Sequence, residues 1–124
     1  MFKRIDHIVI AVHDVEEAAL LYTDTYNLAA SEVLELSHLG LKAIKIDVGN
    51  AYIELAQPSK PDSPMAKFLA EKGEGLYLIA VQVDDLAATV KQLQDNGAKI
   101  LGGPPGPTYI HPRSTHGALI TLME

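Results

Sequence analysis

IDHIVIAVHDVEEAALLY, residues 5–22, decides the fold, because the same pattern returns 71 positions later as YLIAVQVDDLAATVKQL, residues 77–93. Each copy begins with an apolar run of strand length and continues through an acidic position into an amphipathic segment, which predicts a strand followed by a helix. A repeat of this length within 124 residues predicts two copies of one structural unit. The matching pairs are Ile8 with Ile79, Val12 with Val83, Asp14 with Asp85, and Val15 with Leu86.

The end of each copy repeats as well, since AYIELAQP at residues 51–58 is echoed by ALITLME at residues 118–124. The two copies agree in pattern but differ in chemistry at two places, where His7 falls on Leu78 and Glu54 falls on Thr121. One copy therefore carries an imidazole and a carboxylate where the other carries an aliphatic side chain and a hydroxyl.

The composition sets limits on the class of protein. A hydrophobic content of 48% with 21% charged residues is typical of a soluble globular domain. The net charge of −6 argues against nucleic-acid binding, and no apolar run approaches the roughly 20 residues of a membrane span. The absence of cysteine excludes disulfides, thiol nucleophiles and thiolate metal sites. We expect a cytoplasmic protein that binds neither nucleic acid nor membrane.

The first copy is predicted to form a β-α-β-β-β unit. A strand over residues 5–12 precedes a helix that has Asp14 as its N-cap and runs to about Tyr26. Three further strands are predicted over residues 31–36, 41–48 and 51–56, and the Gly49-Asn50 dipeptide is typical of the tight turn between the last two.

A proline-rich linker and a short helix separate the two copies. Ser63-Pro64 is typical of a helix start, so we predict a helix over residues 65–72. The second unit begins with a strand at Leu76 and has an Asp84/Asp85-capped helix that ends at Asn96-Gly97. A strand is predicted over residues 99–101, and the irregular segment 102–107 leaves room for only short final strands.

These elements predict an α+β fold. Two tandem βαβββ modules, the second shortened, are expected to form a curved mixed sheet around a trough. We predict a single domain over residues 1–124, with module one at about 1–58, the linker and short helix at 59–75, and module two at about 76–124.

Alternation along the strands sorts the side chains into two faces. Ile8, Ile10 and Val12 share an aliphatic face that should pack under a helix, which places His7 on the opposite face. In the same way Glu54 shares its face with Tyr52 and Ala56. The positions expected to line the trough in the second unit are Leu78, Ala80, Gln82, Leu119, Thr121 and Met123.

Four stretches of the chain resemble the vicinal oxygen chelate superfamily, which includes glyoxalase I, extradiol dioxygenases, bleomycin-resistance proteins and methylmalonyl-CoA epimerase. They are IDHIVIAVHDVEEAALLY, GNAYIELAQPSKPDSPMAKFLAEKGEGL, IAVQVDDLAATVKQL and IHPRSTHGALITL. The nearest resemblance is to methylmalonyl-CoA epimerase, and its most discriminating segment is ELAQPSKPDSPMAKFL. The resemblance covers almost the whole chain.

In this family four side chains hold a divalent metal, and the resemblance implies His7 and Glu54 as two of them. The other two positions are Leu78 and Thr121 in this sequence, and leucine cannot ligate a metal while a neutral hydroxyl is a poor substitute for carboxylate. The resemblance thus implies a partial, degenerate metal site. One of the family's two acid/base groups also falls on Thr121, whereas the other falls close to His38.

Each candidate also has a structural interpretation. His7 could be a hydrogen-bonded core histidine, and Glu54 could form a hydrogen bond or ion pair with it, because burying an unpaired carboxylate is costly. His38 lies beside a glycine in an expected turn, where solvent exposure competes with catalysis. We expect His111 to be structural, His13 to lie at the surface, and His116 to lie in a loop from which it could reach the trough mouth.

The residues and the resemblance together leave several classes of function. In the first, the chain binds a small carbonyl or acyl-thioester-like ligand in the trough, with His38 and Glu54 as catalytic candidates. The ligand-binding candidates are Tyr52, Leu78, Leu119, Thr121 and Met123. One alternative is an active metal-dependent epimerase or a glyoxalase-like isomerase or lyase. Another is a metal-free small-molecule binding protein of the bleomycin-resistance type. We expect no nucleotide cofactor, and the superfamily resemblance implies a homodimer.

Overall fold

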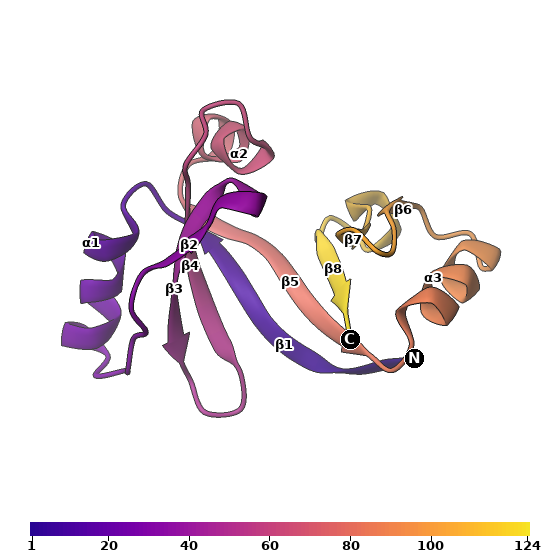
Figure 1. Cartoon of the computed structure of the whole chain (residues 1–124), viewed down its shortest axis with the longest axis horizontal. Helices are drawn as coiled ribbons and strands as arrows, with labels where there is room; N and C mark the ends of the chain where they lie inside the picture. Colours follow the sequence, from indigo (N-terminus) through magenta and orange to yellow (C-terminus); the bar gives the residue numbers. More distant parts are fainter. The chain divides into compact units, whose positions relative to one another are not determined.

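The eight strands of the computed structural model, which describes residues 1–124, form one sheet in the order β2-β3-β4-β1-β5-β8-β7-β6 (Figure 1). The strands are β1 (Phe2–Ala11), β2 (Leu34–Leu36), β3 (Leu41–Asp47), β4 (Tyr52–Pro58), β5 (Gly75–Val83), β6 (Ile100–Gly102), β7 (Thr108–Ile110) and β8 (Ile120–Met123). The sheet is mixed, because β5 and β8 pair in parallel whereas β3 and β4 pair antiparallel. The α+β class with a mixed sheet is therefore confirmed.

Helices connect these strands. They are α1 (Val15–Leu20) with its π-helical continuation η1 (Leu21–Thr25), α2 (Pro64–Lys72) and α3 (Leu86–Asp95), together with the 3₁₀ turns η2 (Ser37–Leu39) and η3 (Pro112–Ser114). None of the helices is both long enough and apolar enough to cross a membrane. The chain divides into two compact units, a first unit of Ile8–Tyr77 and a second unit of Met1–His7 with Leu78–Glu124.

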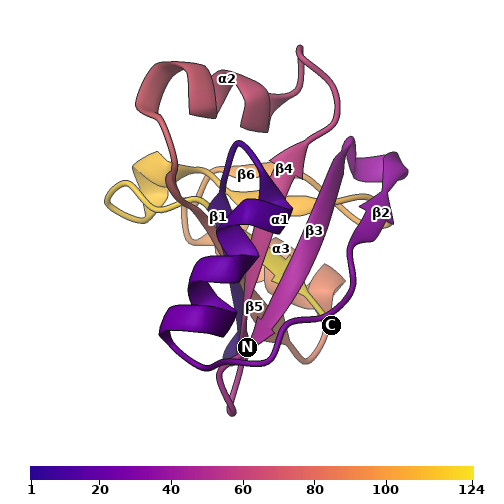
Figure 2. The same ribbon diagram turned by 90° about the vertical axis from the view of Figure 1, so that its left-hand side faces the viewer.

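In the first unit, α1 packs on one face of β3 and β4 (Figure 2). Asp14 begins this helix, because its carboxylate accepts hydrogen bonds from the backbone amides of Glu16 and Glu17 at 3.1 Å. The buried residues of the interface are aliphatic, which supplies the hydrophobic stabilisation of the unit. They are Val12, Val15, Ala19, Ile44, Ile46 and Leu55.

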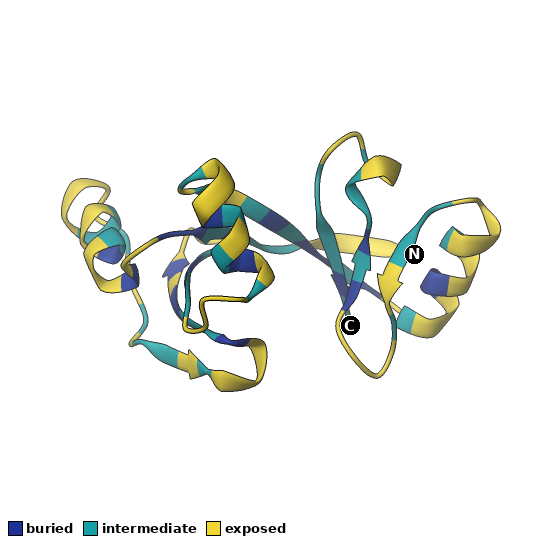
Figure 3. Cartoon of the chain, turned by 90° about the horizontal axis from the view of Figure 1, so that it is seen from above, coloured by how far each residue is buried: buried dark blue, intermediate teal, exposed yellow.

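The second unit builds the same kind of core beneath α3. Its buried residues are Val81, Val83, Val90, Ile110 and Leu122. Buried residues, dark blue in Figure 3, occur on the strands and on one side of the helices. Three positions of the two cores correspond in the sequence repeat, since Val12 matches Val83, Ala19 matches Val90, and Leu55 matches Leu122.

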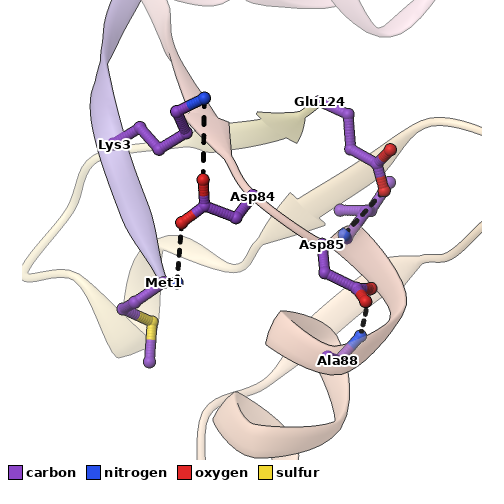
Figure 4. Close-up of polar contacts among 7 residues, drawn as sticks. Met1, Lys3, Asp84, Asp85, Ala88 and Glu124 are labelled. Atoms are coloured by element: carbon purple, nitrogen blue, oxygen red, sulfur yellow. Dashed lines mark hydrogen bonds and ion pairs between the residues drawn. The ribbon is translucent and has the colours of Figure 1, made fainter.

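The repeat also preserves a contact between the end of each unit's last strand and the start of its helix. The Gln57 side-chain oxygen accepts a hydrogen bond from the Val15 amide at 3.0 Å. In the second unit, the Glu124 carboxylate accepts one from the Leu86 amide at 2.8 Å (Figure 4). In both α1 and α3, therefore, a first-turn amide that has no acceptor within the helix donates a hydrogen bond to a side chain far away in the sequence. Figure 4 also shows Asp84 paired with Lys3 and with the amino group of Met1, each at 3.6 Å.

Some predicted boundaries were wrong. The first strand begins at Phe2 rather than Ile5, and the Asp84 amide donates a hydrogen bond to the Met1 carbonyl beside its start. The strand predicted over residues 31–36 is reduced to Leu34–Leu36. The preceding residues instead make an isolated bridge between Ala30 and Ile46. The first helix ends as predicted near Asn27, whose φ of 57° is left-handed and incompatible with a continuing helix.

The two strand-to-helix contacts should contribute similar stability. Gln57→Ala and Glu124→Ala are each expected to lower the free energy of unfolding by about 1 kcal/mol, because each leaves a helix amide without its acceptor. Urea denaturation measures this change. Gln94→Ala, on the exposed side of α3, is the control and should change the stability by less than about 0.5 kcal/mol. Wild-type stability in both contact variants would contradict the interpretation.

Candidate functional site

The first unit has a strand face that points away from α1. Ile44 and Ile46 on β3 and Leu55 on β4 are buried under the helix, so the residues between them must point to the other side. The register of the hairpin pairs Ala43 with Ala56, Lys45 with Glu54, and Asp47 with Tyr52. Glu54 therefore shares a face with Tyr52 and Ala56, as the sequence predicts.

This first-unit face combines small, aromatic and charged side chains. Ala43 and Ala56 are fully buried, whereas Tyr52 and Glu54 are half-buried and take part in further interactions. The Lys45 ammonium lies 4.8 Å from the centre of the Tyr52 ring, within the range of a cation–π interaction. The arrangement offers a carboxylate, an ammonium group and an aromatic ring on adjacent strands.

The matching face of the second unit has no ionised group at the two repeat positions. Leu78 is only 9% exposed, and Thr121 lies beside Ala80 and Tyr109 in the strand register. The Thr121 hydroxyl donates a hydrogen bond to the Thr108 carbonyl at 3.0 Å. The hydroxyl is therefore used in tying β8 to β7, which is a structural role for this side chain.

Leu119 and Met123, the other two ligand-binding candidates of this unit, flank Thr121. Both side chains are half-buried, and the Leu119 carbonyl accepts a hydrogen bond from the Ile79 amide at 3.0 Å. Met123 pairs with Gln82 in the register of β8 and β5, so it shares the face of Thr121. These two residues give the face a largely apolar lining.

His7 belongs to a short chain of polar contacts that the sequence did not reveal. Its Nδ1 lies 2.9 Å from the Asp6 carboxylate, which also receives a hydrogen bond from Arg4 at 2.9 Å. The hydrogen bond from the imidazole holds the pKa of Asp6 below its usual value, and the charge of Arg4 adds to the effect. Because Asp6 accepts from Nδ1, it orients the ring of His7, as carboxylates commonly do for functional histidines.

The remaining histidines lie in different settings. His38 is exposed in η2, and His116 is exposed with a φ of 61°. The His111 side chain accepts a hydrogen bond from the Arg113 amide at 3.0 Å and caps η3, which agrees with its expected structural role. His13 is exposed, and its backbone amide donates to the Glu74 carboxylate at 2.9 Å.

The residues present do not fit the four-ligand metal site that the resemblance implies. The chain contains no group of three or more His, Asp or Glu side chains that could hold a metal ion. Leu78 has no donor atom, and the Thr121 hydroxyl already binds a backbone carbonyl. We therefore derive no chemical step through a metal at these positions.

Two surface hollows lie elsewhere in the first unit, with volumes of about 570 and 590 Å³. Both adjoin the start of α1, where Asp14 and Glu17 contribute to each of them. Neither includes Glu54 or Tyr52, so these hollows are separate from the face described above.

Comparison with known proteins decides the family. The family model of the glyoxalase/bleomycin resistance protein/dioxygenase superfamily matches residues 6–113. The chain belongs to this superfamily.

Several curated relatives of the chain are acyl-CoA epimerases. The chain is 32% identical to human mitochondrial methylmalonyl-CoA epimerase over 129 residues, which cover 98% of this chain and 73% of the relative. It is also 32% identical over 133 residues to the ethylmalonyl-CoA/methylmalonyl-CoA epimerase of Cereibacter sphaeroides, covering 100% of this chain and 99% of that one.

Solved structures of superfamily members share the fold. A Streptomyces coelicolor methylmalonyl-CoA epimerase variant in complex with 2-nitronate-propionyl-CoA gives a TM-score of 0.87 at 30% identity, covering 98% of this chain and 96% of that one. A methylmalonyl-CoA epimerase in complex with methylmalonyl-CoA and NH4+ gives a TM-score of 0.88 at 30% identity, covering 98% and 94% of the two chains. The resemblance to the superfamily and to its epimerases is confirmed.

Sequence reasoning missed one residue in each unit: Asp6, which contacts His7 in the second unit, and Lys45, which lies across from Glu54 in the first. Lys45 had a usable signal, because counting back from the predicted Gly49-Asn50 turn pairs it with Glu54. Asp6 had none, because neighbouring residues on a strand usually point to opposite faces.

The contact between Asp6 and His7 should make stability depend on pH. Because the pKa of Asp6 is lower in the folded protein, the ionised carboxylate stabilises the fold above its unfolded pKa, and this stabilisation is lost as pH falls through the folded pKa. Asp6→Asn is therefore expected to lower the free energy of unfolding at pH 7 by about 0.5–1 kcal/mol, a small value because the groups are partly solvated. Urea denaturation from pH 7 toward pH 3 should show the difference from wild type shrinking.

The control for this prediction is Glu71→Gln, which removes an exposed carboxylate at the end of α2. It should leave the pH dependence close to that of wild type. A constant difference between Asp6→Asn and wild type at every pH would show that ionisation of Asp6 does not stabilise the fold.

Proposed function

We propose that this chain binds a small carbonyl compound or acyl thioester through the strand faces that each unit turns away from its helix. Tyr52 and Glu54 represent this face in the first unit, and Leu78, Leu119, Thr121 and Met123 represent it in the second. The proposal is supported by the superfamily membership and by the CoA esters bound in solved structures of related epimerases.

We further propose that binding does not depend on a four-ligand metal centre. The observation that carries this proposal is the chemistry at the two repeat positions, where Leu78 is a buried aliphatic side chain and Thr121 donates to the Thr108 carbonyl. Such a face is more apolar than a metal site, which favours ligands with apolar parts.

Any proton transfer would then fall to Glu54 and His38. Epimerisation next to a thioester removes the proton of the α-carbon, which gives a planar enolate, and then adds a proton to the opposite face of that enolate, so it needs two acid/base groups. Thr121 and Leu78 cannot serve, and we propose Glu54 on β4 and His38 in η2 as the catalytic residues. The enolate oxygen would require hydrogen-bond donors or a cation to stabilise its charge.

A metal-free small-molecule binding protein without catalytic activity is the second candidate function, and the burial of Leu78 favours it over a metal-dependent epimerase or lyase.

We also propose that the protein acts in the cytoplasm as a homodimer. Large apolar side chains that a partner could cover support the dimer, among them Ile5, Leu21 and Leu76, each more than half exposed. Light scattering on the purified protein would measure its mass.

Metal-independent binding has a direct test. Isothermal titration of methylmalonyl-CoA into the protein should give the same dissociation constant, within about twofold, with EDTA and with added Co²⁺. Elemental analysis of the same preparation should find well under one metal ion per chain. Stoichiometric metal together with binding that disappears in EDTA would contradict the proposal and favour the metal-dependent epimerase.

The missing donors can also be restored. Leu78→His combined with Thr121→Glu adds an imidazole and a carboxylate to the His7 imidazole of the same unit, so the double variant should retain about one Co²⁺ per chain after dialysis while wild type does not. Leu78→Ala combined with Thr121→Val perturbs the same positions without adding donors and is the control. A folded double variant without metal would mean that more than the donor types separates this site from a metal centre.

A further inference from the structure

We propose that Lys45 is a ligand-binding residue that recognises a carboxylate on the ligand. The inference rests on the proposed function, which makes the face of β3 and β4 opposite α1 a ligand-binding face. It adds a specificity-determining residue that the repeat comparison does not indicate, because Lys45 lies outside the repeated stretches.

The position of Lys45 on this face is fixed by its neighbours. Ile44 and Ile46 are buried in the core under α1, so the side chain between them points to the opposite side. Ser31 binds both backbone groups of Lys45. The Ser31 hydroxyl accepts a hydrogen bond from the Lys45 amide, and the Ser31 amide donates one to the Lys45 carbonyl, each at 2.9 Å. Lys45 lies directly across from Glu54 in the strand register.

The Lys45 ammonium is oriented by an aromatic ring and has no counter-ion at contact distance. It lies 4.8 Å from the centre of the Tyr52 ring, which favours a cation over its face. The ion pairs of the chain use the Met1 amino group, Lys3, Arg4, His7 and Lys91, and none involves Lys45. The side chain is exposed, so its charge is accessible to a ligand.

The surroundings select a single small anion. Glu54 lies across from Lys45, and its negative charge would repel a group with several charges, such as a diphosphate, more strongly than one carboxylate. On one side of Lys45 along the strands lie Ala43 and Ala56, which are fully buried, and on the other side lie Asp47 and Tyr52. A ligand that combines a short apolar acyl part with one carboxylate matches the half-buried Tyr52 ring and the ammonium group beside it.

Two CoA esters isolate the contribution of the carboxylate. Methylmalonyl-CoA and propionyl-CoA share the CoA part and the thioester and differ in one carboxylate. Isothermal titration at low ionic strength should show wild type binding methylmalonyl-CoA about threefold to tenfold more tightly than propionyl-CoA, which is the range of one partly solvated charge pair. Lys45→Met, which keeps the length of the side chain, should reduce this ratio to about one.

A matched control and a rescue variant separate charge recognition from damage to the fold. Lys42→Met removes a cation from the same strand, and since Lys42 pairs with Gln57 on the other face, the wild-type ratio should persist. Lys45→Arg keeps the charge and should retain most of the ratio, whereas a merely structural role would make Arg and Met equally harmful. Thermal unfolding of every variant checks the fold.

The outcomes distinguish the role of Lys45 from the proposed function on which it rests. An unchanged ligand ratio in Lys45→Met, or an equal loss in Lys45→Arg and Lys45→Met, overturns the role of Lys45 and leaves binding itself intact. If wild type binds neither CoA ester, the proposed function fails and the assignment of Lys45 fails with it. Loss of the ratio in Lys45→Met alone supports the inference.

Discussion

The burial of one strand face beneath a helix is the constraint on which the rest of this structure depends. In the first unit, Ile44, Ile46 and Leu55 must lie under α1. A shift of the hairpin by one residue would expose all of them and bury charged neighbours, so the register is strongly determined. The same constraint places Lys45, Glu54 and Tyr52 together on the other face. The chemistry of the candidate site is thus a consequence of where the aliphatic residues have to go.

The internal repeat separates what the fold needs from what it leaves open. Three core positions correspond in both units. So does the hydrogen bond that the first helical amide donates to a side chain near the strand end, Gln57 in one unit and Glu124 in the other. The positions that differ, His7 against Leu78 and Glu54 against Thr121, lie outside both of these aliphatic cores. The fold therefore tolerates chemical differences there.

Patterns with a strong physical cause were predictable from the sequence. The helices capped by Asp14, Ser63 and Asp85 begin where the capping residues indicate, because a short polar side chain satisfies the first free amides. The strand over residues 31–36 was overestimated, because Ser31 uses its amide and hydroxyl to bind the backbone of Lys45 instead of extending β2. Side chains that bind backbone groups compete with regular strands, and propensity alone does not reveal the outcome.

The candidate site was only partly predictable, for a related reason. The sequence showed that Glu54 and Thr121 are chemically different residues at matching positions of the repeat. It did not show the hydrogen bond from Thr121 to the Thr108 carbonyl, because that bond depends on β7 and β8 being neighbours, which no local pattern reveals.

That hydrogen bond changes the interpretation of the site. If Thr121 only replaced a metal ligand, its hydroxyl would have no role of its own. Instead the hydroxyl links β8 to β7, and Leu78 at the other repeat position is buried. These positions have structural roles of their own, so the charged chemistry of the repeat positions is concentrated on Glu54 and His7. Glu54 lies across from Lys45 in the strand register, and a ligand carboxylate can bind the Lys45 ammonium on this face without a metal.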